Sequence, residues 1–166
     1  MWGRAINPFD KLRSCGGSSG GEAGLVVTNC VPIGLGTDLG GSIRIPADFL
    51  GLYGFKATSH RVPFSGTKSL LTFNALTTPG GRISPTIGPL CRSMRDVVDF
   101  TRFMFHPEVN LKYDDYTPPM PFREDLYLKA KKGRGIRVGI CESLTTFPAS
   151  QINIDAVNKV REALHS

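Results

Sequence analysis

Two serines lie in glycine-rich turns, where backbone amides can approach a reacting hydroxyl. Ser18 lies within the turn GGSSGG at residues 16–21, and Ser42 ends the turn DLGGS at residues 38–42. Glycine lets the backbone take positive φ and come close to a ligand. A serine hydroxyl surrounded by amide donors is typical of acyl transfer, which needs a nucleophile, a base and donors aimed at the oxyanion.

Ser42 is the better candidate for the nucleophile, because Gly40 and Gly41 remove the side chains in front of its hydroxyl. The amides of this turn could converge at the start of the helix that we expect after it. They belong to Leu39, Gly40, Gly41 and Ser42. Loss of one such donor typically costs about 3 kcal/mol of transition-state stabilisation.

The base is harder to find in the sequence. The three histidines, His60, His106 and His165, lie in no recognisable motif, and surface positions are the simpler interpretation. A Ser-His-Asp triad is therefore poorly supported, and a lysine is favoured as the base. No metal-ligand spacing and no paired carboxylates occur, so we predict neither a metal nor a cofactor. The cysteines, Cys15, Cys30, Cys91 and Cys141, have no CxxC spacing.

Each serine turn has a simpler interpretation when it is taken alone. GGSSGG could be a flexible linker, and TDLGGS could cradle a phosphate. The two turns occur together, however, joined by an apolar helix–strand pattern over residues 22–37. This combination favours the acyl-transfer site. An anion- or nucleotide-binding module remains the weaker alternative.

Composition favours a folded domain. Of 166 residues, 40% are hydrophobic and 20% are charged, which excludes wholesale disorder. The net charge is +6, and its densest cluster is Lys129, Lys131, Lys132, Arg134 and Arg137. A solvated basic turn explains this cluster, so we predict no nucleic-acid partner. A membrane surface stays open without support, and nothing indicates an oligomeric state. Without a signal peptide or an apolar run of about 18 residues, the expected location is intracellular.

Hydrophobic periodicity and turn residues predict alternating helices and strands. Helices are expected at 22–29, 43–49, from a Ser93 capping box to Pro107, and at 153–165; strands at 31–37, 51–57 and 136–140; irregular segments at 1–17, 60–88 and 114–121. Such alternation predicts an α/β fold with a partly parallel sheet.

Three segments resemble the amidase signature family: GGSSGGE at 16–22, GLGTDLGGSIRIP at 34–46 and GLYGFKAT at 51–58. Within that family they are most similar to the fatty acid amide hydrolases. The resemblance implies an α/β fold with a mixed central sheet flanked by helices, and one partial amidase domain over residues 1–166. It also implies hydrolysis of a carboxylic amide through an acyl-enzyme, by a Ser–cis-Ser–Lys triad.

The resemblance implies a role for each residue of the two turns. Ser42 matches the nucleophile, and Ser18 matches the bridging serine, with a cis peptide bond to Gly17 or Ser19. The oxyanion hole matches Leu39, Gly40 and Gly41, and the supporting positions match Ser19, Asp38 and Arg44.

The sequence departs from the family at the lysine. The family's lysine lies well upstream of the first serine turn, and only Lys11 precedes Ser18, outside any matching motif. We therefore expect the chain to be the middle of an amidase, inactive or very weak alone. The expected partner is a small amide, with a fatty acid amide implied by the resemblance. The alternative is a pseudoenzyme that binds an amide or acyl group without cleaving it.

Overall fold

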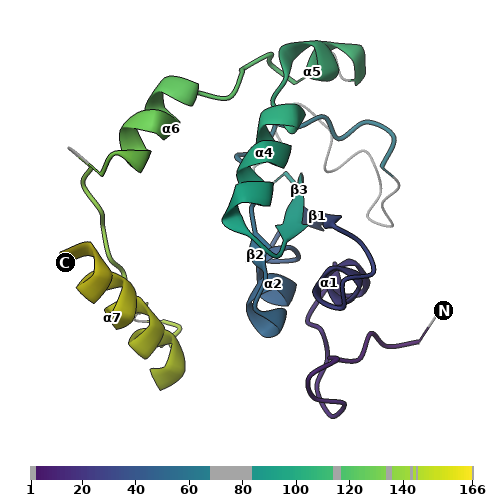
Figure 1. Ribbon diagram of the computed structural model, residues 1–166. Helices are drawn as coiled ribbons and strands as arrows, with labels where there is room; N and C mark the ends of the chain where they lie inside the picture. Colours follow the sequence, from purple (N-terminus) through teal and green to yellow (C-terminus); the bar gives the residue numbers. More distant parts are fainter. Residues whose placement is uncertain are drawn as a thin grey trace. The chain divides into compact units, whose positions relative to one another are not determined.

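The computed structural model describes residues 3–67, 84–113, 117–133, 136–142, 144 and 146–165. The chain divides into two compact units, Met1–Phe122 and Arg123–Ser166. Both serine turns belong to the first unit. Figure 1 shows the elements of each unit.

The first unit is built on a three-stranded sheet in the order β1-β3-β2. Its strands are β1 (Ile33–Asp38), β2 (Tyr53–Gly54) and β3 (Thr86–Cys91). β3 pairs antiparallel with both neighbours, and Ile33 lies opposite Cys91. The α/β class is confirmed, but the partly parallel pairing is wrong for the described strands. Two parallel neighbours need a crossover connection between them, usually a helix. The helix between β1 and β2 does not make them neighbours, because β3 lies between them.

Helices α1 (Gly20–Val27) and α2 (Arg44–Leu50) pack beside this sheet (Figure 1). Both lie close to their predicted positions, and Pro46 sits in the first turn of α2, where its missing N–H costs no helical bond. The core between them is apolar and almost fully buried: Cys15, Ala23, Val26, Ile43, Ala47, Leu50 and Leu90. This core holds the helix that follows the first serine turn against the helix that follows the second.

Helix α4 (Met94–Met104) begins at the predicted capping residue. The Ser93 hydroxyl accepts a hydrogen bond of 3.1 Å from the Asp96 amide, which satisfies one free donor of the first turn. The helix buries Val97, Thr101 and Met104. Pro107 then starts α5 (Pro107–Tyr113), a helix that was not predicted. Proline suits a first helical position because its φ is already set.

Strand β2 is shorter than the predicted strand at 51–57. The Phe55 amide still donates to the Pro89 carbonyl at 3.1 Å, but Pro89 has no N–H to donate in return. The ladder therefore ends after Gly54. The irregular stretch predicted at 60–88 overlaps β3 at its end, and its part at 68–83 lies outside the described residues.

The second unit contains α6 (Glu124–Lys131) and α7 (Gln151–His165). α7 confirms the predicted C-terminal helix, whereas α6 was not predicted. Lys129 and Lys131 of the basic cluster lie in the last turn of α6, where the helix dipole favours cations. Residues 136–140 form no strand, because they pair with no other segment that the structure describes. Among the described residues, no helix combines the length and apolar character of a membrane span.

Candidate active site

A backbone hydrogen bond joins the two serine turns. The Ser19 amide donates to the Ser42 carbonyl oxygen at 3.2 Å. The peptide bond between Gly17 and Ser18 is cis, which is one of the two positions that the resemblance implied. The Ser18 side chain is exposed and that of Ser42 is half-buried. Ligands could therefore reach both turns.

The side chain of Ser19 holds the first turn on strand β1. Its hydroxyl accepts from the Thr37 amide at 3.3 Å and donates to the Thr37 carbonyl at 3.4 Å. Gly36 makes this approach possible, because a Cβ there would lie 2.8 Å from Ser19 Oγ and 2.9 Å from Ile43 Cγ1. Ser19, for which the resemblance implied a supporting position, thus connects the first turn to β1, the strand that leads to the second turn.

The second turn closes around the carboxylate of Asp38, which is fully buried. Oδ1 accepts from the Gly41 amide at 2.8 Å, and Oδ2 accepts from the Ile43 and Arg44 amides at 3.1 Å and 3.3 Å. The Arg44 guanidinium binds both oxygens, Nη2 to Oδ1 at 2.8 Å and Nε to Oδ2 at 3.0 Å. Such a bidentate pair constrains geometry more than a single contact does.

The hydrogen bonds also control the charge of Asp38. Burial alone would raise the pKa of this carboxyl, since it disfavours the charged form. The Arg44 side chain and the amides of Ile43, Gly41 and Arg44 outweigh burial and hold the pKa well below its usual range. The Asp38 hydrogen bond in turn raises the pKa of Arg44. The turn is therefore organised around an ion pair that stays charged at neutral pH.

Of the four amides predicted from the sequence as oxyanion donors, one is already bonded within the turn and three are not. The Gly41 amide bonds to Asp38, while the amides of Leu39, Gly40 and Ser42 bond to no described residue. Gly41 has φ of +127°, and a Cβ there would lie 2.8 Å from Ile45 Cδ1. Glycine is required at this position by both the conformation and the space.

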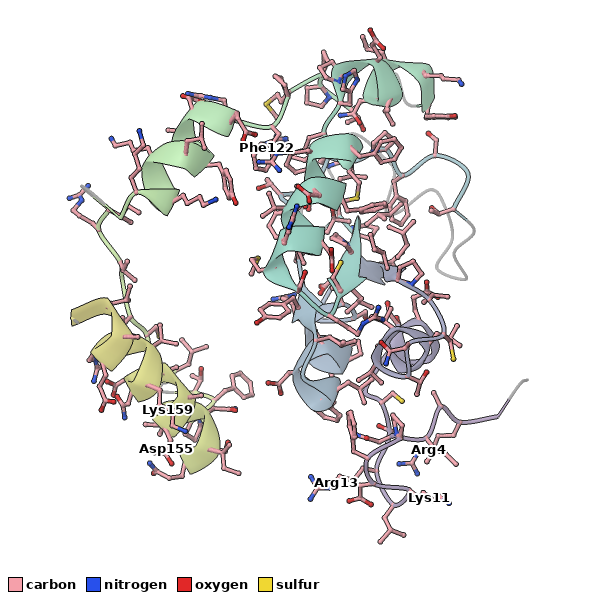
Figure 2. The ribbon with its side chains drawn as sticks, in the orientation of Figure 1. Arg4, Lys11, Arg13, Phe122, Asp155 and Lys159 are labelled. Carbon is pink, nitrogen blue, oxygen red and sulfur yellow. The ribbon has the colours of Figure 1, made fainter. Side chains whose placement is uncertain are left out.

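No base is found next to the serines within the part of the chain that the structure describes. No lysine or histidine side chain there bonds to the hydroxyl of Ser18 or Ser42. Figure 2 shows Lys11 with Arg4 and Arg13 on the N-terminal segment. Lys56 donates to the Ala57 carbonyl at 3.1 Å. The two serine hydroxyls are also not bonded to each other.

Sequence reasoning missed two side chains that hold α1. Glu22 Oε1 accepts from the Leu35 amide at 3.1 Å, and Arg92 Nη1 donates to the carbonyls of Val26 and Val31 at 2.6 Å and 2.9 Å. The glutamate that follows GGSSGG was visible in the sequence, but its partner was not. Nothing local to Arg92 indicates a role at the end of α1.

A protein-family model described as Amidase matches residues 1–166. The chain belongs to the amidase family. An amidase of Gibberella zeae is 41% identical over 126 residues, which cover 74% of this chain and 21% of that protein. Fatty-acid amide hydrolase 1 of Sus scrofa is 34% identical over 143 residues, 86% of this chain and 23% of that protein.

Solved structures support the same assignment. A bacterial aryl acylamidase of the amidase signature family superposes with a TM-score of 0.76 and 32% identity, covering 99% of this chain and 31% of that one. A fatty acid amide hydrolase superposes with a TM-score of 0.72 and 27% identity, covering 96% and 26%. The resemblance to the amidase signature family is confirmed. The chain spans roughly a fifth to a quarter of the curated relatives above.

Proposed function

We propose that this chain carries the nucleophile of an amide hydrolase, with Ser42 as nucleophile and Ser18 as the bridging serine. The observation that carries the proposal is the hydrogen bond from the Ser19 amide to the Ser42 carbonyl, which brings the two serine turns together. Family membership supports amide substrates. The bidentate pair between the buried Asp38 carboxylate and the half-exposed Arg44 guanidinium supports the proposal further, because it holds the turn that presents Ser42.

The proposed reaction is acyl transfer in two stages. Ser42 Oγ attacks the carbonyl carbon of the amide, and its proton passes through the Ser18 hydroxyl towards a base. The amides of Leu39, Gly40 and Ser42 stabilise the oxyanion, while Gly41 and Asp38 fix their direction. Collapse breaks the C–N bond, the amine leaves with a proton, and the acyl group stays on Ser42 as an ester. Water then attacks the ester, which releases the carboxylic acid and restores Ser42.

The proposed base is a lysine that none of the described hydrogen bonds includes, on a segment upstream of the first serine turn. An unassisted serine hydroxyl is a weak nucleophile at neutral pH, so the chain alone should cleave amides very poorly. The measurement compares anilide hydrolysis by this chain and by a version extended upstream through a lysine-bearing segment. The extended version should be faster. Equal activity in both, dependent on Ser42, would contradict the proposed base.

The proposed substrate is a carboxylic amide. The names of similar proteins include a fatty-acid amide hydrolase, an acetamidase of Emericella nidulans and an aryl acylamidase. Long-chain, short and aromatic amides are thus all represented among proteins that resemble this one. A panel of these amides against the extended version would identify the class that is cleaved fastest.

The nucleophile is tested by covalent labelling with a fluorophosphonate. The wild-type chain should react slowly at one serine, Ser42→Ala should abolish the reaction, and Ser18→Ala should slow it. Ser150→Ala is the matched control, because Ser150 is exposed and lies in the second unit. Labelling that survives Ser42→Ala but not Ser150→Ala would reject Ser42 as the nucleophile.

A second candidate function is a pseudoenzyme that binds an amide or acyl group without cleaving it. The missing contact between the serines and any described lysine or histidine favours it. It predicts amide binding by calorimetry, with no fluorophosphonate labelling in either the chain or its extended version.

A further inference from the structure

The outer edge of strand β1 is directed towards helix α1. Leu35 lies opposite Pro89 and Thr37 lies opposite Ile87 in the antiparallel register. Pro89 has no N–H, so it cannot exchange a pair of hydrogen bonds with Leu35. Narrow and wide pairs alternate along an antiparallel ladder. The backbone groups of Leu35 and Thr37 therefore point away from β3.

Side chains from the start of α1 bond three of these four outward groups. Glu22 Oε1 accepts from the Leu35 amide at 3.1 Å. The Ser19 hydroxyl bonds both the amide and the carbonyl of Thr37. Among the described strands β1 is at the edge of the sheet, where unpaired amides would otherwise be free to bond elsewhere. The first turn of α1 thus takes the place of a neighbouring strand.

The strand is shaped to receive these side chains. Gly34 and Gly36 lie on the buried face of β1. A Cβ at Gly34 would lie 2.8 Å from Glu22 Cγ, and one at Gly36 would lie 2.8 Å from Ser19 Oγ. A Cβ atom in a folded protein essentially never lies this close to another heavy atom. The alternation of glycine along β1 therefore lets Glu22 and Ser19 reach the strand.

We propose that Glu22 is a positioning residue, whose carboxylate fixes the Ser18 turn against the Ser42 turn. α1 follows the Ser18 turn directly, and β1 runs directly into Asp38. A hydrogen bond between Glu22 and Leu35 therefore sets the register between the two turns. That this register serves catalysis rests on the proposed function. That Glu22 fixes the position of one turn against the other does not depend on it.

Arg92 provides a matched control at the opposite end of the same helix. It bonds the carbonyls of Val26 and Val31, after the last turn of α1. Its removal should loosen α1 as Glu22→Ala does, but at the end that is far from the serine turns. A general loss of helix packing would affect the turns equally in both variants.

The experiment measures amide hydrogen exchange in the full chain for Glu22→Ala, Glu22→Gln and Arg92→Ala. The reporter is the Ser19 amide, which bonds to Ser42 and not to Glu22. Glu22→Ala should speed its exchange by at least about tenfold, because one lost hydrogen bond to a charged group corresponds to a factor of roughly 10 to 100. Glu22→Gln keeps an acceptor oxygen for Leu35 and should restore most of the protection. Arg92→Ala should speed exchange near Thr28 and leave Ser19 unchanged.

Two outcomes would overturn the proposal. In one, Glu22→Ala speeds exchange only at Leu35; in the other, the Ser19 amide responds equally to Arg92→Ala. Fluorophosphonate labelling of the same variants separates this proposal from the proposed function. If wild-type Ser42 does not react, the function fails while the exchange data still decide the role of Glu22. If Ser42 reacts, its rate should fall in Glu22→Ala and recover in Glu22→Gln.

Discussion

The Ser19 amide lies 3.2 Å from the carbonyl oxygen of Ser42 and donates a hydrogen bond to it. The bond uses only backbone atoms, so a change of side chain at either serine does not remove it directly, except for proline at Ser19. Its length depends instead on what holds each turn. Ser19 Oγ anchors the first turn to Thr37, and the Asp38 carboxylate anchors the second through Gly41 and Arg44.

Asp38→Asn should destabilise the chain more than the same substitution of a surface aspartate does. The amide nitrogen would replace an acceptor with a donor, facing donors from Gly41 or from Arg44. The Asp38 carboxylate is fully buried, whereas the Arg44 side chain is about half exposed, so the loss of these hydrogen bonds costs about 1 to 3 kcal/mol. Urea unfolding should show this loss, together with slower labelling of Ser42. The control is Asp99→Asn on α4, where Asp99 forms exposed ion pairs with Arg95 and Arg102, and each pair contributes about 0.3 to 0.5 kcal/mol. Equal losses in both variants would contradict the anchoring role.

Acid should destabilise the chain through the same carboxyl. The pKa of Asp38 is lower in the folded chain than its unfolded value of about 3.9, so the unfolded chain binds more protons in acid. The contribution is complete above about pH 5 and is lost as pH falls below the unfolded pKa towards the folded one. Unfolding free energy measured across this range should fall more steeply for the wild type than for Asp38→Asn. If the free energy of unfolding fell equally steeply with pH in both chains, Asp38 would not be the cause of the loss of stability in acid.

The cysteines should report on the integrity of the first unit. Burial raises the pKa of the Cys91 thiol to about 11, with a further rise from the charge of Asp96, opposed by Arg92. Burial also raises the pKa of Cys15. Only a thiolate reacts quickly, so a thiol reagent at pH 8 should modify exposed Cys30 and spare both buried thiols. Mass spectrometry of the modified peptides measures this. Rapid reaction at Cys91 would show that the sheet does not hold in solution.

Local signals in the sequence were sufficient to predict three of the helices. Glycines before α1, the Ser93–Asp96 cap and the helical spacing of α7 each act within a few residues, and all three helices form close to where they were predicted. The order of the strands was different. Nothing within β1 or β2 indicates that β3 lies between them, because pairing depends on residues far along the chain.

The same distinction applies to the candidate site. Ser19, Asp38 and Arg44 were assigned supporting positions through the resemblance, but the sequence did not show that Asp38 would take the amide of Gly41. Glu22 was missed because its partner is the amide of Leu35, and a backbone donor carries no side-chain signal. Residues 136–140 had the alternation of a strand and formed none, since periodicity cannot supply a partner.

Gly36→Ala should separate the two serine turns without touching either serine. Its Cβ would lie 2.8 Å from Ser19 Oγ and 2.9 Å from Ile43 Cγ1, so Ser19 must leave Thr37 or β1 must shift. Overpacking of this kind costs about 1 to 3 kcal/mol, and Ser42 labelling should slow with it. Gly21→Ala is the matched control: no atom lies within 4 Å of the added Cβ, and alanine in the first turn of α1 favours the helix by part of the roughly 1 kcal/mol that it contributes in a helix interior. The free energy of unfolding measured in urea should therefore fall for Gly36→Ala and rise for Gly21→Ala. A Gly36→Ala chain as stable and as reactive as the wild type would show that the close approach of Ser19 to β1 is not needed.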